Sequence, residues 1–115
     1  MEDVITVHDL NLALTQRIGT AEPLFMAQRY YAEACYYHAC ESESSGGAYV
    51  ATMKIIAMLT GVAFDDVLAI VREEWRKGAY VIEVWDDDVR CHAEAWGISR
   101  EEAEKSHPRP IIGGR

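Results

Sequence analysis

Two stretches of the chain repeat one layout at a fixed offset, and this repeat constrains the fold more than any other feature. In each stretch a helical pattern stops at a glycine, and two adjacent acids follow at the start of a new helical pattern. The corresponding residues are Ala57, Gly61, Asp65 and Asp66 in the first joint and Ala93, Gly97, Glu101 and Glu102 in the second. Glycine favours the left-handed conformation that ends a helix, and acids suit the positive end of the next one. The repeat predicts two related helix–glycine–helix units, and because an open solenoid needs about three repeats or more, it favours a compact bundle.

Helix start and stop signals predict about six helices and therefore a mainly α fold. The expected helices cover residues 7–17, 24–41, 48–60, 64–77 and 86–96, with a short sixth helix after Ser99. Thr6 with Asp9, and Ser99 with Glu102, have the spacing of a capping box. A chain of 115 residues is long enough for one hydrophobic core. We expect a single helical domain over residues 1–107 and a C-terminal tail over residues 108–115. The expected core lies on the helices that carry Leu24, Met53, Val67 and Val89.

The segment from Ala79 to Trp85 is the ambiguous part of the chain. Its aromatic and β-branched residues have strong β propensity, so we expect it to be extended. It either pairs with the segment from Val4 to Val7 as a minor two-stranded β patch or continues directly into the next helix. Asp86, Asp87 and Asp88 would then stand at the N-terminus of the fifth helix, where the helix dipole favours negative charge.

The charge balance limits the classes of partner. The chain has 19 acidic and 11 basic residues and a formal net charge of -8. Such an excess repels nucleic acid and anionic membranes and favours basic proteins, although solubility alone also explains it. No apolar stretch approaches the roughly 20 residues that a membrane-spanning helix needs. Three cysteines without an export signal indicate reduced thiols and a cytoplasmic location.

The first joint resembles the DNA-binding helix-turn-helix pattern over about twenty residues. The pattern rests on Ala57, Gly61, Val67 and Ile70. The helix that would enter the major groove begins with Phe64, Asp65 and Asp66, which places carboxylates where DNA contacts need basic or amide side chains. Direct nucleic-acid binding is therefore not expected, and a helix-turn-helix regulator stays an alternative.

Two pairs of cysteine and histidine are the candidate metal ligands. They are Cys35 with His38 on one helix and Cys91 with His92 on another. Together they could supply a tetrahedral zinc site, but neighbouring residues on a helix point about 100° apart, so only one of Cys91 and His92 would reach it easily. Buried free cysteines are also ordinary core residues. We therefore expect no cofactor and keep a small zinc protein as an alternative.

Catalytic signals are missing from the sequence. It has neither a glycine-rich phosphate loop nor a nucleophile elbow, and its neighbouring carboxylates are typical of a solvated helix surface. Tyr30, Tyr31, Tyr36 and Tyr37 have the spacing of core residues whose hydroxyls reach the edge of the core. We therefore expect a protein without enzymatic activity.

Clustered acids are the basis of the functional hypothesis. The chain would be an inhibitor or adaptor that presents a carboxylate-rich face to a basic protein, and nucleic-acid-binding proteins are among the candidate partners. The partner-binding residues would be Asp65, Asp66, Asp86, Asp87, Asp88, Glu101 and Glu102, with Trp85 and Trp96 as anchors where they are exposed. In size and charge, though in no motif, the chain resembles small acidic anti-restriction and anti-CRISPR inhibitors of phage and plasmids. The opposing interpretation is that helix N-termini attract acids without any partner.

A homodimer also stays open, because the aromatic residues exceed what so short a core needs.

Overall fold

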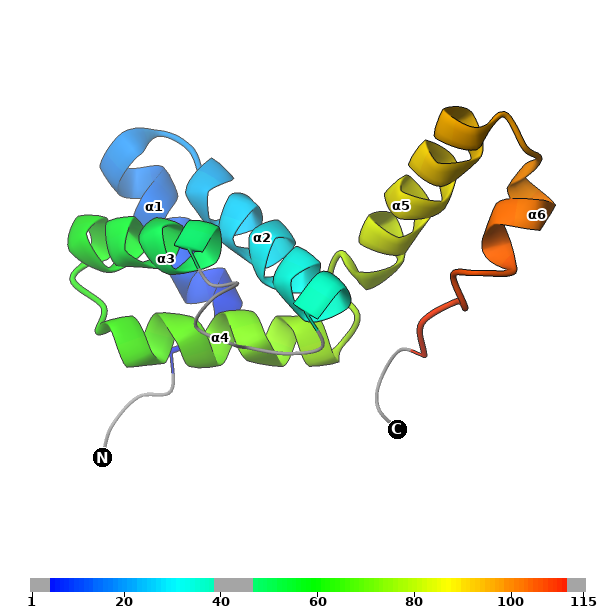
Figure 1. Ribbon diagram of the computed structural model, residues 1–115. Helices are drawn as coiled ribbons and strands as arrows, with labels where there is room; N and C mark the ends of the chain where they lie inside the picture. The colour runs from blue at the N-terminus through cyan, green and yellow to red at the C-terminus, as the bar shows by residue number, and fades with distance from the viewer. Residues whose placement is uncertain (1–4, 39–46, 112–115) are drawn as a thin grey trace.

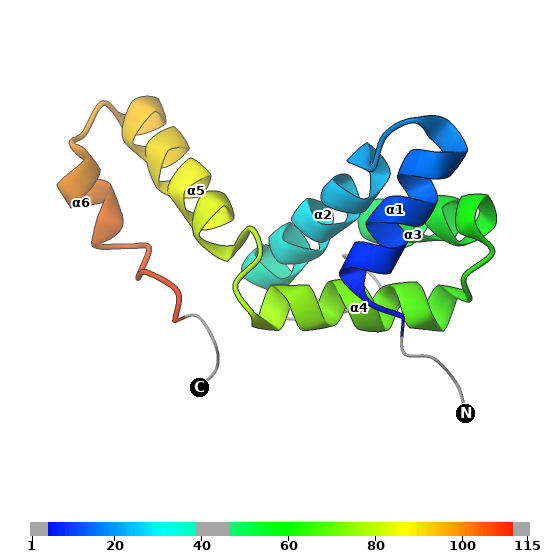
Figure 2. The same ribbon diagram turned by 180° about the vertical axis from the view of Figure 1, so that it is seen from behind.

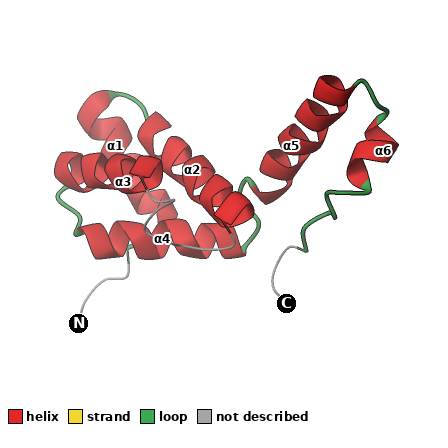
Figure 3. Ribbon diagram, viewed as in Figure 1, coloured by secondary structure: helices red, strands yellow, loops and turns green. Residues whose placement is uncertain are grey.

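Six α-helices form most of the chain that the computed structural model describes, residues 5–38 and 47–111 (Figure 1). They are α1 (Val7–Ile18), α2 (Glu22–His38), α3 (Gly47–Thr60), α4 (Phe64–Arg76), α5 (Val81–Trp96) and α6 (Arg100–Glu104). The described residues contain no strand (Figure 3). The prediction of a mainly helical, compact bundle is therefore confirmed.

Helices α1 to α4 enclose the main hydrophobic core, and α2 packs against each of the other three. The fully buried side chains of this core include Leu10, Leu14, Leu24, Tyr31, Met53, Ile56, Val67 and Val71. The ring of Tyr31 meets the rings of Tyr49 and Trp75 edge-on, with centroids 5.0 and 5.9 Å apart. Each such side chain contributes about 1.5–3 kcal/mol through burial, so this core is the principal source of stability.

A second, smaller hydrophobic cluster lies where α5 and α6 meet. It consists of Trp85, Val89 and Ala103, with Tyr36 of α2 packed against it. Helix α5 touches the bundle through α2, and the α5–α6 hairpin projects from there (Figure 1, and from behind in Figure 2). The longest extent of the molecule is consequently 52 Å, against 30 and 25 Å in the other directions. Val89 is buried as predicted, but in this cluster and not in the main core. The single domain over residues 1–107 stays a prediction.

Helix ends follow the sequence signals closely. Thr6 and Asp9 form the predicted capping box, in which Thr6 Oγ1 accepts from the Asp9 N–H at 3.1 Å and Asp9 Oδ2 accepts from the Thr6 N–H at 3.0 Å. These hydrogen bonds, the backbone one first, lower the pKa of Asp9 below its usual value. Ser99 Oγ accepts from the Glu102 N–H at 3.1 Å, which is one half of the second predicted box.

The two glycine joints have the same local geometry. Gly61 and Gly97 adopt left-handed φ values of 80° and 63°, and their N–H groups donate to the carbonyl oxygens of Ala57 and Ala93. A side chain would be strained at either position, which explains the glycine. Beyond these joints the units differ, because α4 is a long helix and α6 has only five residues. A relation between the two whole units stays a prediction.

The expectation of extended structure from Ala79 to Trp85 is wrong. Gly78 and Tyr80 have positive φ values of 106° and 64°, and helix α5 begins at Val81. Val84, Trp85 and Val89 are buried and follow helical spacing. Packing against α2 and α6 therefore overrides the local β propensity. The described residues therefore do not form the β patch that was the alternative, because Val7 begins helix α1. Val4 lies outside the described part of the chain.

Candidate functional site

A groove of about 500 Å³ lies where the chain enters α1 beside α4. We call it the α4 groove. Its apolar lining is Ile5, Val7, Ala69 and Ile70, and its polar lining is Thr6, Asp66, Glu73, Glu74 and Lys77. The α4 residues of the groove share one helix face, since they follow one another at three- and four-residue steps. The groove therefore combines an apolar surface with three carboxylates and one ammonium group.

Among residues 5–38 and 47–111, the carboxylates of α4 form only weak contacts. Glu73 lies 3.8 Å from Arg76 and Glu74 lies 3.5 Å from Lys77, each within one helical turn. Ion pairs within one helical turn contribute only about 0.3–0.5 kcal/mol, so a partner's cation can replace the one beside the exposed Glu73 at little cost, whereas Glu74 is only 21% exposed. Asp65 and Asp66 are exposed in the first turn of α4, as predicted. The carboxylates of α4 are therefore available to a basic ligand.

Asp86 and Asp87, by contrast, are paired with arginines of other elements. Asp86 lies 2.7 Å from Arg100 at the start of α6, and Asp87 lies 2.6 Å from Arg29 of α2 and also contacts Arg90. The hydrogen bond from Arg29, more than any other contact, holds the pKa of Asp87 below its usual value. These two carboxylates thus connect α5 to α6 and to the bundle.

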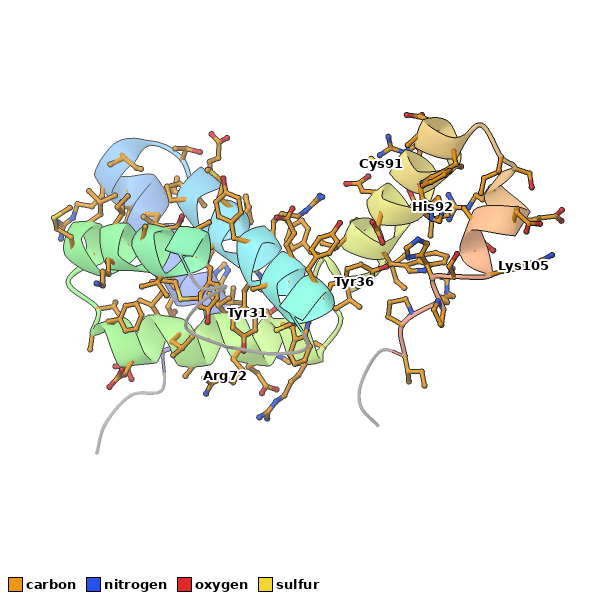
Figure 4. All side chains as sticks on the ribbon, in the orientation of Figure 1. Tyr31, Tyr36, Arg72, Cys91, His92 and Lys105 are labelled. Atoms are coloured by element: carbon orange, nitrogen blue, oxygen red, sulfur yellow. The ribbon has the colours of Figure 1, made fainter. Side chains whose placement is uncertain are left out.

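Asp88 is the centre of a polar network between α2, α5 and the segment after α6. Its carboxylate accepts from the hydroxyls of Tyr36 at 2.9 Å and Tyr37 at 3.4 Å, and lies 3.0 Å from Nδ1 of His107. Nε2 of His107 lies 2.7 Å from Nδ1 of His92. Burial first, and then Asp88, raises the pKa of Tyr36 and of Tyr37. Figure 4 shows Tyr36 in this position between α2 and α5.

The three aspartates also differ from the prediction in their place on the helix. Because α5 begins at Val81, they occupy its second turn and not its N-terminus. The helix dipole therefore does not account for them, and their contacts with α2, α6 and His107 do. The sequence analysis missed His107, Tyr36 and Arg29 as partners of these aspartates. The one sequence signal was the helical spacing of Asp88 with the apolar Val84 and Trp85, both of which are buried.

A partner-binding anchor has to be exposed, and Trp85 is not, because only 3% of its surface is exposed. Its Nε1–H donates to the carbonyl of His107 at 2.7 Å, and the guanidinium carbons of Arg100 and Arg109 lie 5.3 and 5.1 Å from its ring centre. Trp85 thus holds α6 and the following segment against α5. Trp96 is 74% exposed at the end of α5 and meets the condition.

Glu101 and Glu102 stand in the first turn of α6, as predicted. Glu102 lies 3.2 Å from Lys105, and both glutamates are exposed. A helix of one turn has only a small dipole. Helix α6, which carries these two carboxylates, belongs to the projecting hairpin and lies away from α4 (Figure 1). The predicted acidic residues are therefore divided among three places and do not form one face.

The candidate zinc ligands are not brought together where the structure describes them. Cys35 is half-buried on α2, Cys91 is exposed on α5, and Nδ1 of His92 is hydrogen-bonded to Nε2 of His107. Figure 4 shows Cys91 and His92 on α5. The side chain of His38 lies outside the described part of the chain. Among the side chains of residues 5–37 and 48–111, no group of three or more histidines, cysteines and acids has the arrangement of a metal site.

Two further findings concern the class of protein. None of the helices in the described residues has the length and apolar character needed to cross a bilayer. In comparisons with known protein families, curated proteins and solved structures, nothing matches the chain. The α4 groove and its surroundings are therefore the features from which a function can be inferred.

Proposed function

We propose that this protein is a non-enzymatic inhibitor or adaptor that binds a basic segment of another protein in the α4 groove. The observation that carries the proposal is the combination in one groove of the apolar Ile5, Val7 and Ile70 with the carboxylates of Asp66, Glu73 and Glu74. A phosphate or a nucleic acid would be repelled there. A peptide that alternates Lys or Arg with apolar residues would satisfy both kinds of lining.

The expected ligand is an amphipathic helix or an extended segment with basic residues about one helical turn apart. Apolar contact would supply most of the affinity, while the carboxylates would give orientation and a fast, salt-dependent association. Asp65, just outside the groove, would add to the attraction. The action of a small acidic inhibitor, by analogy with anti-defence proteins of phage and plasmids, would be to cover a basic surface that its target uses. We place the protein in the cytoplasm on the basis of its odd cysteine count.

Capture of partners from a lysate of the native host, followed by mass spectrometry, tests this function. The test variant is Asp66→Lys with Glu73→Lys, which reverses two groove carboxylates. The matched control is Glu83→Lys with Glu94→Lys, which makes the same charge change at a first-turn acid and a later exposed acid of α5. We expect the wild type and the control to capture a basic protein that the test variant captures about tenfold less, a loss of about 1.4 kcal/mol.

Salt provides a second readout of the same capture. Because Asp66 and Glu73 are exposed, binding should weaken as the ionic strength rises above about 0.15 M. Equal capture by the test variant and the control would contradict the proposal, since it would show that net charge and not the groove decides binding.

A further inference from the structure

Helix α3 is apolar on nearly every side, although only part of it is buried. Lys54 is the one charged residue among its 14 residues. A helix with this composition is typical of complete burial inside a protein. Tyr49, Met53 and Ile56 on one side of α3 do reach the main core. The opposite side needs a separate explanation.

That opposite side carries an exposed apolar stripe. It consists of Ala48, Ala51, Ile55 and Met58, with Ile55 46% and Met58 75% exposed. These residues lie at helical spacing, so they form one continuous line along α3. Figure 1 shows α3 at the front of the bundle, with no other helix over the side that faces the viewer. We call this line the α3 stripe.

The α3 stripe is complementary to itself. Along the helix, its two small side chains (Ala48 and Ala51) come first and its two large side chains (Ile55 and Met58) follow. When two copies of α3 run antiparallel about a twofold axis near Met53, Ala48 of each copy lies opposite Met58 of the other, and Ala51 lies opposite Ile55. Each large side chain then faces an alanine, which allows close approach of the two helices. A parallel pairing would instead place large residues on large ones and small on small.

Charge also favours this surface for self-association. Two copies of a chain with a net charge of -8 repel each other over most of their surface. Helix α3 contains no acidic residue, so approach along it costs the least electrostatic energy. The α4 groove is lined by residues of α4 and of the entry to α1 and by none of α3, so the groove would stay open.

We propose that the protein forms a symmetric, antiparallel homodimer through the α3 stripe. This inference does not depend on the proposed function of the groove. A stripe from residue 48 to 58 is about 15 Å long at 1.5 Å per residue. One helix pair of that length is at the low end of stable interfaces, so we expect a dissociation constant of about 1–100 µM.

Sedimentation velocity from about 1 to 500 µM measures this association. Ile55→Lys should raise the dissociation constant at least tenfold. Leu12→Lys on α1 is the matched control, because Leu12 is 45% exposed and the charge change is the same. The control should dimerise as the wild type does. A monomeric wild type throughout the range, or equal weakening by both variants, would overturn the proposal.

Disulfide cross-linking tests the register in a background without the three native cysteines. A mixture of chains carrying Ala51→Cys and Ile55→Cys should form a mixed cross-linked dimer faster than either chain cross-links with itself. Faster self-linking of Ala51→Cys would indicate a parallel or offset pairing and would overturn the antiparallel arrangement. Both chains should first be checked for wild-type helix content by circular dichroism.

Discussion

Helices α4 and α5 both carry several carboxylates on an apolar helical frame, yet the carboxylates have different surroundings. Asp86, Asp87 and Asp88 of α5 contact arginines, tyrosines and a histidine from α2, α6 and the segment after α6. Within the described part of the chain, Glu73 and Glu74 of α4 pair with Arg76 and Lys77 at the end of the same helix, and together with Asp66 they border a groove. One residue type thus stabilises the fold in one helix and stays available in the other. The neighbouring element, and not the number of acids, decides which of these two roles a carboxylate has.

The difference follows from how each helix is packed. Helix α4 belongs to a bundle whose core already holds it through Val67, Ile70 and Val71. The α5–α6 hairpin has a much smaller cluster, centred on Trp85 and Val89. Polar contacts therefore contribute a larger share of the stability of the hairpin, and α5 uses its carboxylates for them.

The largest effect is expected at the hydrophobic centre of the hairpin. Trp85→Ala should lower the free energy of unfolding of the hairpin by about 3–5 kcal/mol, because it removes a buried ring and the hydrogen bond to His107. Hydrogen exchange of the α5 and α6 amides measures this loss. Trp96→Ala is the control and should change it by less than about 0.5 kcal/mol, since Trp96 is exposed. Similar values for the two variants would show that Trp85 does not hold the hairpin.

The next-largest effect on the free energy of unfolding is expected at Asp88 of α5, and Asp66 of α4 is its comparison. Asp88→Leu should cost about 2–3 kcal/mol, because Tyr36 and His107 lose their acceptor in a partly buried site. Asp66→Leu should cost no more than about 1 kcal/mol, the contribution of an exposed first-turn acid. Urea denaturation of both variants measures the difference. If Asp66→Leu were as costly as Asp88→Leu, the contrast between the helices would be wrong.

These contacts explain which parts of the architecture could be predicted from the sequence. Helix ends depend on nearby residues, so Gly61, Gly97 and the box of Thr6 and Asp9 were predicted correctly. The start of α5 was not, because the β propensity of residues 80–85 is local while the packing that overrides it is not. The roles of the aspartates depend on residues as distant as Arg29, 58 positions from Asp87. No local pattern contains that information.

The smallest effect is the acid sensitivity of Asp87. Its pKa is lowered in the folded protein, chiefly by Arg29, so its stabilising contribution is present above the unfolded pKa of about 3.9 and is lost as the pH falls through the lower folded value. Because the side chain is 36% exposed, the contribution should be below about 1 kcal/mol. Asp87→Asn should be less stable than the wild type at pH 7, and the difference should shrink as the pH falls below the unfolded pKa of about 3.9. A difference that is constant between pH 7 and pH 3 would contradict the role of this charge.

The proposed contrast is that Asp66 and Glu73 of α4 serve partner binding, whereas Asp86, Asp87 and Asp88 of α5 hold the fold. Charge reversal in each helix tests it most directly, with thermal unfolding and partner capture measured on the same samples. Asp66→Lys with Glu73→Lys should unfold near the wild-type temperature and capture about tenfold less partner. Asp86→Lys with Asp87→Lys should unfold several degrees lower and, where still folded, capture as much as the wild type. The opposite pattern, with α4 reversal destabilising the fold and α5 reversal abolishing capture by folded protein, would contradict the account.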